Sequence, residues 1–317
     1  MTWTSRTVGF AALCLMCAEP ASAALLCQKR SGVVVVRDAC KRKERPLDLA
    51  ELGAVGPPGP QGDPGAQGPP GVGPLTQCPS DSVRAGNVCM DKYEAVVVRV
   101  ADPTGANAGL VAKIQDGTAT EAELTAAGAT PLGLAGDGED YAPCAASGQS
   151  CTDVYAVSLP TAVPSSRLTW FQAQQACKNA RKRLPSNAEW QAAVVGTPDP
   201  GPDNGTTDCN TGSALAVIPT GSRSGCVSGD GAFDMVGNVQ EWVTDWLPRS
   251  TACGTWSAGV SPTGDTQCLA GAATTEEPAA LLRGGTFGSG TDAGPLTIDG
   301  SNEPSNPNAD IGFRCAR

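Results

Sequence analysis

The sequence contains no histidine, and this absence limits the chemistry that it can perform. A Ser-His-Asp or Cys-His nucleophile uses an imidazole as its general base, so both arrangements are disfavoured. Zinc is disfavoured as well, because the chain has neither a histidine ligand nor a Cys-x-x-Cys pair. Aromatic residues make up only 4% of the 317 residues, while 39 glycines and 26 prolines favour loops and turns over long helices.

The chain also lacks an apolar run long enough to cross a bilayer. Residues 1–23 instead have the pattern of a secretory signal peptide: Arg6 supplies a positive end, residues 8–17 a short apolar run, and residues 21–23 (ASA) a cleavage site. The alternative is an ordinary N-terminal helix. We therefore expect a secreted chain, extracellular or periplasmic, with no membrane span after signal removal. The net charge of -10 argues against nucleic acid as the main partner.

Cysteine is plentiful, and its number is even once the signal peptide is removed. Twelve cysteines then remain, and disulfides are the default state in an oxidising compartment. Sequence separation alone suggests five local pairs and leaves one long-range pair: Cys27 with Cys40, Cys78 with Cys89, Cys144 with Cys151, Cys209 with Cys226, Cys253 with Cys268, and Cys177 with Cys315.

Residues 24–52 form a small basic segment. The β-branched run at 33–36 predicts a short strand, and a bridge from Cys27 to Cys40 could close a hairpin around it. The charge has two interpretations: it binds an anionic surface such as lipopolysaccharide or a cell-wall polymer, or it is a solvated face or a cap that nucleates a trimer. Its cations are Lys29, Arg30, Arg37, Lys41, Arg42, Lys43 and Arg45.

Residues 53–74 carry a collagen-like repeat. Glycine occupies every third position from Gly53 to Gly71, and proline fills many of the positions between. This is the pattern of a triple helix, in which only glycine fits at the crowded axis of three chains. The repeat predicts a short stalk that joins three copies of the chain. A disordered Pro/Gly linker is the alternative.

The remaining residues, 75–317, form the predicted globular domain. Residues 101–165 predict loops with one short helix near 121–127. Thr169 can cap a helix, and the SNAE sequence at 186–189 is a capping box that opens a second one. Residues 231–246 mix tryptophans with carboxylates and amides, which indicates a core segment with a polar purpose, because buried carboxylates need partners.

Four motifs occur in a fixed order in this domain: RLPSNAEW at 183–190, DMVGNVQEWVTD at 234–245, RGGT at 283–286 and GFRC at 312–315. Over residues 76–317 the chain resembles the sulfatase-modifying-factor family, which includes formylglycine-generating enzyme. A DKYE sequence at 91–94 is similar to bacterial members. The resemblance implies an α+β, C-type-lectin-like fold with two helices, a small twisted antiparallel sheet and long loops. It also implies the Cys177–Cys315 bridge.

The redox chemistry of that family does not carry over to this sequence. Formylglycine-generating enzymes use two cysteines shortly after the Arg-Gly-Gly motif to bind copper(I). An ungapped alignment places these positions at Ser289 and Gly294, neither of which can supply a soft thiolate. The iron-dependent relatives need several histidines. We therefore predict no catalytic residues and no copper or iron site.

Calcium is the cofactor that the resemblance still implies. The family holds an ion with side-chain oxygens at the positions of Asp234 and Glu241 and with backbone carbonyls at those of Gly237 and Val239. The alternative is that the two carboxylates satisfy backbone amides around a tight turn. For a second family site, only Asn210 matches.

We therefore expect a secreted, trimeric, non-catalytic binding or adhesion module, whose ligand is a polysaccharide or a protein. The alternatives are a formylglycine-generating-type oxidoreductase and a structural extracellular or surface-layer component. The ligand surface is predicted on the loops after Arg283, where the relatives place their active site. The candidate ligand-binding residues are Phe287, Ser289, Asp292, Asp299 and Asn302.

Overall fold

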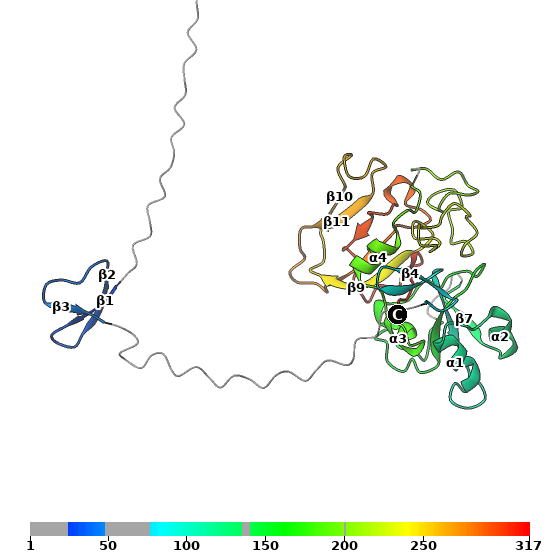
Figure 1. Ribbon diagram of the computed structural model, residues 1–317, viewed down its shortest axis with the longest axis horizontal. Helices are drawn as coiled ribbons and strands as arrows, with labels where there is room; N and C mark the ends of the chain where they lie inside the picture. The colour runs from blue at the N-terminus through cyan, green and yellow to red at the C-terminus, as the bar shows by residue number, and fades with distance from the viewer. Residues whose placement is uncertain (1–24, 48–76, 135–139, 200) are drawn as a thin grey trace, which may run out of the picture. The chain divides into compact units, whose positions relative to one another are not determined.

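The computed structural model describes residues 25–47, 77–134, 140–199 and 201–317. The chain divides into two units, Met1–Gly71 and Val72–Arg317 (Figure 1). The predicted signal peptide at 1–23 and the collagen-like stalk at 53–74 lie outside the described residues. None of the helices in the described part of the chain has the length and apolar character needed to cross a bilayer.

The described part of the first unit is a three-stranded antiparallel sheet. Strand β1 (Leu25–Lys29) lies between β2 (Val34–Arg37) and β3 (Glu44–Pro46). The Cys27–Cys40 disulfide closes this sheet, as expected. Cys27 is fully buried, whereas most residues around it are exposed, because so small a sheet can cover little more than its own disulfide.

The second unit begins with two small sheets. A ribbon of β4 (Ser82–Ala85) and β5 (Val88–Asp91) is joined to the preceding segment by Cys78–Cys89. Strand β6 (Ala95–Arg99) then pairs with β7 (Thr130–Leu132) on one side and β8 (Val154–Ser158) on the other.

The largest sheet has six strands in the order β10-β11-β13-β12-β9-β14. Its bounds are β9 Gln240–Leu247, β10 Ala252–Thr255, β11 Thr266–Ala270, β12 Ala279–Arg283, β13 Ile298–Asp299 and β14 Ile311–Phe313. This sheet is mixed, since β11 pairs with β13, and β9 with β14, in parallel, while the smaller sheets are antiparallel as expected. Other strands of the same sheet lie between the members of both pairs in the sequence: β12 between β11 and β13, and β10 to β13 between β9 and β14.

The described residues contain four α-helices: α1 (Ala108–Gln115), α2 (Glu121–Ala126), α3 (Trp170–Asn179) and α4 (Asn187–Ala193). Thr169 and Ser186 cap α3 and α4 through reciprocal capping boxes, which confirms the two helix starts expected there. Helix α2 matches the expected short helix. Helix α1 was not expected, and it packs Leu110, Val111 and Ile114 into the interior.

The disulfides follow the pairing expected from sequence separation. The long-range bridge joins α3 to the segment after β14, with a sequence separation of 138 between its two cysteines. It lies in a buried cluster that also contains Trp242 of β9. A neighbouring buried cluster is built around Trp190 of α4. The six pairs are Cys27–Cys40, Cys78–Cys89, Cys144–Cys151, Cys177–Cys315, Cys209–Cys226 and Cys253–Cys268.

Candidate functional site

The turn before β9 places two carboxylates of residues 231–246, Asp234 and Glu241, in the interior. Asp234 and Asn238 adopt the left-handed backbone conformation, with φ of 56° and 57°. Gly237 lies between them with φ of 74°, and a Cβ there would overlap the carbonyl oxygen of Asn210. Glycine is therefore required at 237, because its backbone is both left-handed and in close contact with another segment.

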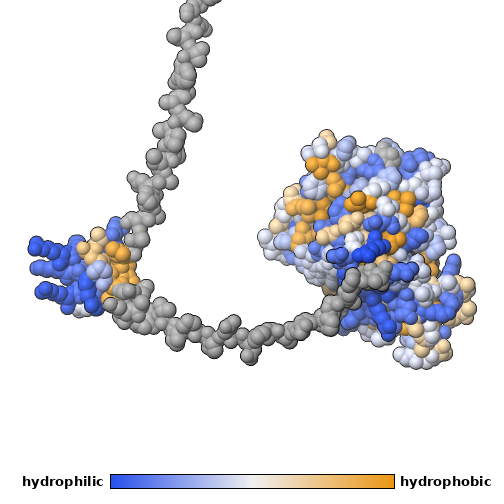
Figure 2. Space-filling model, in the orientation of Figure 1, coloured by the Kyte–Doolittle hydropathy of each residue, from blue (hydrophilic) through white to orange (hydrophobic). Residues whose placement is uncertain are grey.

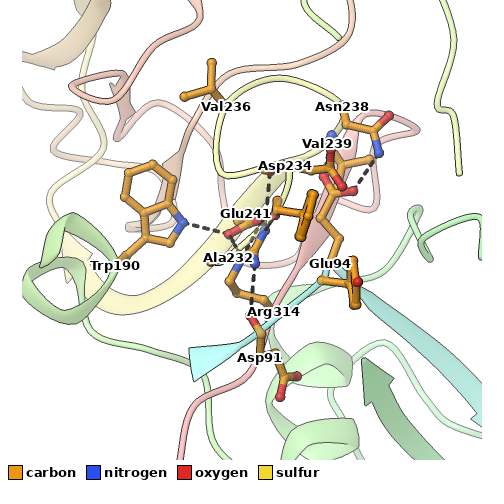
Figure 3. A network of polar contacts seen from close by, with 12 residues as sticks. Asp91, Glu94, Trp190, Ala232, Asp234, Val236, Asn238, Val239, Glu241 and Arg314 are labelled. Carbon is orange, nitrogen blue, oxygen red and sulfur yellow. Dashed lines mark hydrogen bonds and ion pairs between the residues drawn. The ribbon is translucent and has the colours of Figure 1, made fainter. Parts of the chain in front are cut away.

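Glu241, at the start of β9, is fully engaged by protein donors. Arg314 donates from Nε to both of its carboxylate oxygens at 2.8 Å and from Nη2 to Oε1 at 2.6 Å (Figure 3). Trp190 donates from Nε1 to Oε2 at 2.7 Å. All three side chains are buried. The remaining Arg314 donors reach the backbone carbonyls of Asp91 and Phe233.

Two further carboxylates lie next to this ion pair. Glu94 accepts hydrogen bonds from the Asn238 side chain at 2.6 Å and the Val239 backbone at 3.0 Å. Burial, together with the nearby carboxylates of Asp234 and Glu241, raises the pKa of Glu94 well above its usual value. Asp234 accepts from the Gly221 backbone at 2.6 Å, and burial raises its pKa to about 6. One guanidinium therefore faces three buried carboxylates.

This donor set does not fit the calcium ion that the resemblance implies at Asp234, Gly237, Val239 and Glu241. Calcium needs free hard oxygens, but both Glu241 oxygens accept from Arg314 and one also accepts from Trp190. The Arg314 guanidinium already supplies the positive charge that an ion would bring. Asp234 satisfies a backbone amide, as the alternative interpretation holds. Across the described ranges, no three His, Cys, Asp or Glu side chains are arranged to hold a metal.

The second calcium position retains one matching feature. Asn210 is buried, and its Oδ1 has no hydrogen-bond partner. Its Nδ2 donates to the carbonyl of Ala216 and to Asn238 Oδ1, so Asn210 is tied into the same turn. A single unpaired oxygen is a fraction of the six to eight ligands that calcium takes.

The two positions that carry cysteines in the enzymes lie in the loop between β12 and β13. Ser289 Oγ accepts from the Thr286 backbone at 3.0 Å and lies 3.1 Å from Thr286 Oγ1. At Gly294, a Cβ would overlap the carboxylate of Asp265. Asp265 is itself fixed by Ser261 Oγ and by the Leu296 backbone. The space that a second cysteine would need is therefore filled by another side chain.

Arg283 of the Arg-Gly-Gly motif holds this loop in place. Its guanidinium stacks on the Trp190 ring at 4.4 Å from the ring centroid and donates to the backbone carbonyls of Pro295 and Thr297. Burial lowers the Arg283 pKa to about 10, and the group stays charged at neutral pH. Trp190 therefore links Arg283 to Arg314. Its ring stacks on the Arg283 guanidinium, and its Nε1 donates to Glu241, which binds Arg314.

The candidate ligand-binding residues fall into two local groups. Phe287, Ser289 and Asp292 lie around the 3-10 helix η1 (Gly290–Asp292), where Asp292 is exposed and the other two are half-buried. Asp299 and Asn302 form a separate turn after β13, in which Asp299 accepts from Ser301 and from the Asn302 side chain at 2.9 Å. Each group is also tied to its surroundings: the Phe287 backbone donates to the Asn238 carbonyl, and Asn302 Oδ1 accepts from Asn306 at 2.9 Å.

Sequence reasoning missed the two residues that complete the buried network, Glu94 and Arg314. Both lie in motifs that the resemblance uses, DKYE and GFRC, but neither was assigned a role. Glu94 bonds to residues more than 140 positions away, and Arg314 to residues 73 or more positions away. The available signal was an arginine flanked by Phe313 and Cys315, since an arginine inside an apolar segment needs a buried acid.

Comparison with known proteins gives matches in the second unit. Proteins named serine/threonine-protein kinase Pkn1 are similar to this chain: that of Chlamydia caviae is 29% identical over 152 residues, and that of Chlamydia trachomatis is 30% identical over 167 residues. Each match covers 47% of this chain, and the chain spans only 23% of the length of these relatives. The kinase activity in their names belongs to the whole relatives.

Solved structures of low sequence identity are also similar. The Major Tropism Determinant M1 variant is 18% identical, covers 77% of this chain and 53% of its own, and gives a TM-score of 0.42. PvdO from Pseudomonas aeruginosa is 19% identical, covers 76% of this chain and 88% of its own, and gives a TM-score of 0.35.

A family model supplies the decisive match. The model described as "Sulfatase-modifying factor enzyme 1-like domain" matches residues 139–317, which is more than half of the chain. This match and the sheet-rich architecture confirm the expected α+β, C-type-lectin-like fold. All four ordered motifs lie inside the matched range, whereas Glu94 of the buried network lies before it. The chain therefore belongs to the sulfatase-modifying factor enzyme 1-like domain family.

Proposed function

We propose that this chain is a binding module that uses the family fold without the family's copper-dependent oxidation. The observation that carries the proposal is the environment of the two cysteine positions. Ser289 is hydrogen-bonded to Thr286, and Gly294 packs its backbone against the Asp265 carboxylate. Copper(I) needs soft thiolate ligands, and this loop offers a hydroxyl and a hydrogen atom instead.

Cysteines from elsewhere in the chain do not replace the missing pair. All twelve cysteines between residues 25 and 317 are paired in six disulfides. A disulfide sulfur is neither a thiolate ligand nor a nucleophile until it is reduced. The chain also lacks histidine, which removes the imidazole ligands used by iron-dependent relatives.

The binding surface in this proposal is formed by the loops from Phe287 to Asn302, which replace the active site of the enzymes. These loops are anchored by Arg283 but keep polar groups at the surface, such as Asp292. The proposal includes secretion and assembly into a trimer through the repeat at 53–74. Three domains on one stalk would convert weak binding at each domain into avidity for a repeated ligand, a polysaccharide or a surface protein.

The proposal is tested first by an activity assay. The purified chain is incubated with copper, oxygen, a thiol reductant and a peptide containing Cys-x-Pro-x-Arg, and formylglycine is measured by mass spectrometry. We expect no product, while a formylglycine-generating enzyme under the same conditions gives product. Turnover by the chain would replace the proposal with the oxidoreductase alternative.

A binding assay tests the positive half of the proposal. The intact chain is applied to arrays of bacterial glycans and surface proteins, and its bound ligands are tested again with Asp292→Ala and with Asp116→Ala. Both residues are exposed acids. Asp116 lies at the end of α1, far along the chain from the proposed surface. We expect only Asp292→Ala to weaken binding. Equal effects of the two variants would remove the loop from the site.

A further inference from the structure

The first unit concentrates positive charge that the family domain does not use. Seven of the 22 lysines and arginines fall between residues 29 and 45, although the whole chain has a net charge of -10. Residues 25–47 contain only two acids, Asp38 and Glu44. A small sheet that carries this much charge of one sign is destabilised by its own repulsion, so the charge requires an explanation beyond the fold.

The cations line two hollows that share most of their charged lining residues. A concavity of about 430 Å³ is lined by the turn between β1 and β2 and by the segment that leads into β3. Its charged lining residues are Lys29, Arg30, Arg42, Lys43, Glu44 and Arg45. All the cations among them are exposed. The hollow therefore presents guanidinium and ammonium groups from two segments of the chain to the same volume of solvent.

Little of this charge is neutralised inside the unit. Within residues 25–47 the structure gives one ion pair, from Arg37 Nε to Glu44 Oε2 at 3.1 Å. Glu44 also accepts from the Lys41 backbone, and this hydrogen bond and Arg37 hold the pKa of Glu44 below its usual value. Arg45 donates to the neutral side chain of Gln28. The basic pole, defined as Lys29, Arg30, Lys41, Arg42, Lys43 and Arg45, is thus available to an external anion.

The opposite side of the unit indicates which class of anion fits. Leu26, Val34 and Val36 share one face of the sheet by register, and the two valines are 44% and 67% exposed. Hydrophilic and hydrophobic side chains gather on opposite sides of this unit (Figure 2). Arg45 shares the face of these valines by register, but because the hydrophilic and hydrophobic side chains gather on opposite sides, one flat bilayer surface does not meet both.

The composition of residues 25–47 also disfavours nucleic acid as the partner. Residues 25–47 contain no tryptophan, tyrosine or phenylalanine. Aromatic side chains are the usual stacking platforms for exposed bases and the usual anchors at a lipid interface. A flexible polymer that carries an anionic group on each repeat can pair with the exposed cations. It has no bases or acyl chains and so needs no aromatic side chains.

We propose that the basic pole binds a linear anionic polysaccharide, with carboxylate, sulfate or phosphate groups seated among Arg30, Arg42 and Lys43. Arginine pairs with such oxyanions through two parallel hydrogen bonds, and lysine adds a compact point charge. The site is independent of the family domain and of the function proposed for it. One chain would then hold two partners, a polyanion at residues 25–47 and a second ligand at the loops after Arg283.

Binding of the full chain to immobilised polygalacturonate and dextran sulfate tests the proposal. The variant Arg30→Gln/Arg42→Gln/Lys43→Gln removes three cations of the pole. The matched control Lys113→Gln/Lys178→Gln/Arg181→Gln removes three exposed cations of the second unit. We expect the first variant to weaken binding by about tenfold or more and the control to change it little, because the interaction is local and screened by salt.

Two further measurements test a membrane or DNA as the partner and give a result that does not depend on the folding of a variant. Vesicles with about one-quarter phosphatidylglycerol and duplex DNA are tested as competitors. Tighter binding of either than of both polysaccharides, or equal affinity of the two triple variants, overturns the proposal. Acetylation footprinting of the unmodified chain gives a readout without substitution: polysaccharide is expected to protect Lys29, Lys41 and Lys43 but not Lys113, and absence of this protection also overturns the proposal.

Discussion

Arg314 and Glu241 form a buried ion pair in which one guanidinium nitrogen donates to both carboxylate oxygens and a second donates to one of them. Both side chains are at most 1% exposed. The pair joins the C-terminal segment to β9 and, through Trp190, to α4. It also provides the positive charge for the carboxylates of Glu94 and Asp234 next to it.

Removal of the guanidinium is expected to destabilise the second unit strongly. Arg314→Met would leave Glu241 buried without a cation, and breaking a buried pair on one side typically costs about 3–5 kcal/mol. Arg314→Lys is expected to rescue only part of this loss, because a lysine cannot reach both the carboxylate and the backbone carbonyls of Asp91 and Phe233. Urea unfolding measures both, with exposed Arg181→Met as the control; a loss no larger than the control's would contradict the importance of this pair.

Stability is expected to fall as the pH rises from about 4 to about 6. Burial raises the pKa of Asp91 and of Asp234 to about 6 in the folded chain, from 3.8 in the unfolded chain. Between these values the folded state binds more protons than the unfolded state, so the unfolding free energy decreases with pH. Asp91→Asn is expected to flatten this dependence in urea titrations at several pH values. An unfolding free energy that increases throughout the window would contradict the assignment.

Calcium removal is expected to leave the protein unchanged. The Glu241 oxygens are occupied by Arg314 and Trp190, and Asn210 Oδ1 is only one unpaired oxygen at the second candidate position. Melting curves with excess calcium and with a calcium chelator should therefore coincide, and metal analysis should find no stoichiometric calcium. A chelator-induced decrease in melting temperature would restore the calcium prediction made from the family resemblance.

Space at position 294 can be tested by adding one methyl group. Gly294→Ala would place its Cβ against the Asp265 carboxylate, and overpacking of this kind typically costs about 1–3 kcal/mol. Gly109→Ala is the matched control, because Gly109 lies in α1 with open space around its Cα. Alanine there should be neutral or stabilise the helix by about 0.5–1 kcal/mol. Equal effects in thermal unfolding would show that Asp265 moves aside freely.

The long-range disulfide is expected to contribute more than a local one. Replacement of Cys177 and Cys315 by alanine opens a loop of 138 residues, for which the chain-entropy model gives about 4–5 kcal/mol. The same change at Cys253 and Cys268 opens a loop of 15 residues, worth about 3 kcal/mol in that model. Denaturant titrations of the two double variants, run under non-reducing conditions, measure the difference. A larger loss at Cys253–Cys268 would contradict it.

Local signals in the sequence were sufficient for some parts of the fold. The Thr169 and Ser186 caps defined two helices because a capping box is complete within four residues. Cysteine separation gave the disulfides, since five of the six bridges span 17 residues or fewer. Helix α1 was missed because its N-cap residue, Asn107, makes no side-chain cap and because the helix contains Gly109.

Other parts depend on contacts that the sequence does not display. The mixed character of the large sheet arises from where β13 and β14 insert, and both are only two or three residues long. The candidate site was placed by a family resemblance rather than by spacing. Calcium is disfavoured at Glu241 because Arg314 occupies its carboxylate oxygens. The two residues are 73 positions apart in the sequence, so no local pattern shows this contact.

The position of β14 has a consequence for folding during synthesis. Strand β14, Arg314 and Cys315 all follow residue 310, yet they complete the large sheet, the buried ion pair and the long-range bridge. A nascent chain that has reached only residue 310 can close every other bridge in its proper order. Until residues 311–315 emerge, however, Cys177 has no native partner, and its thiol is one that an oxidoreductase or chaperone would have to protect.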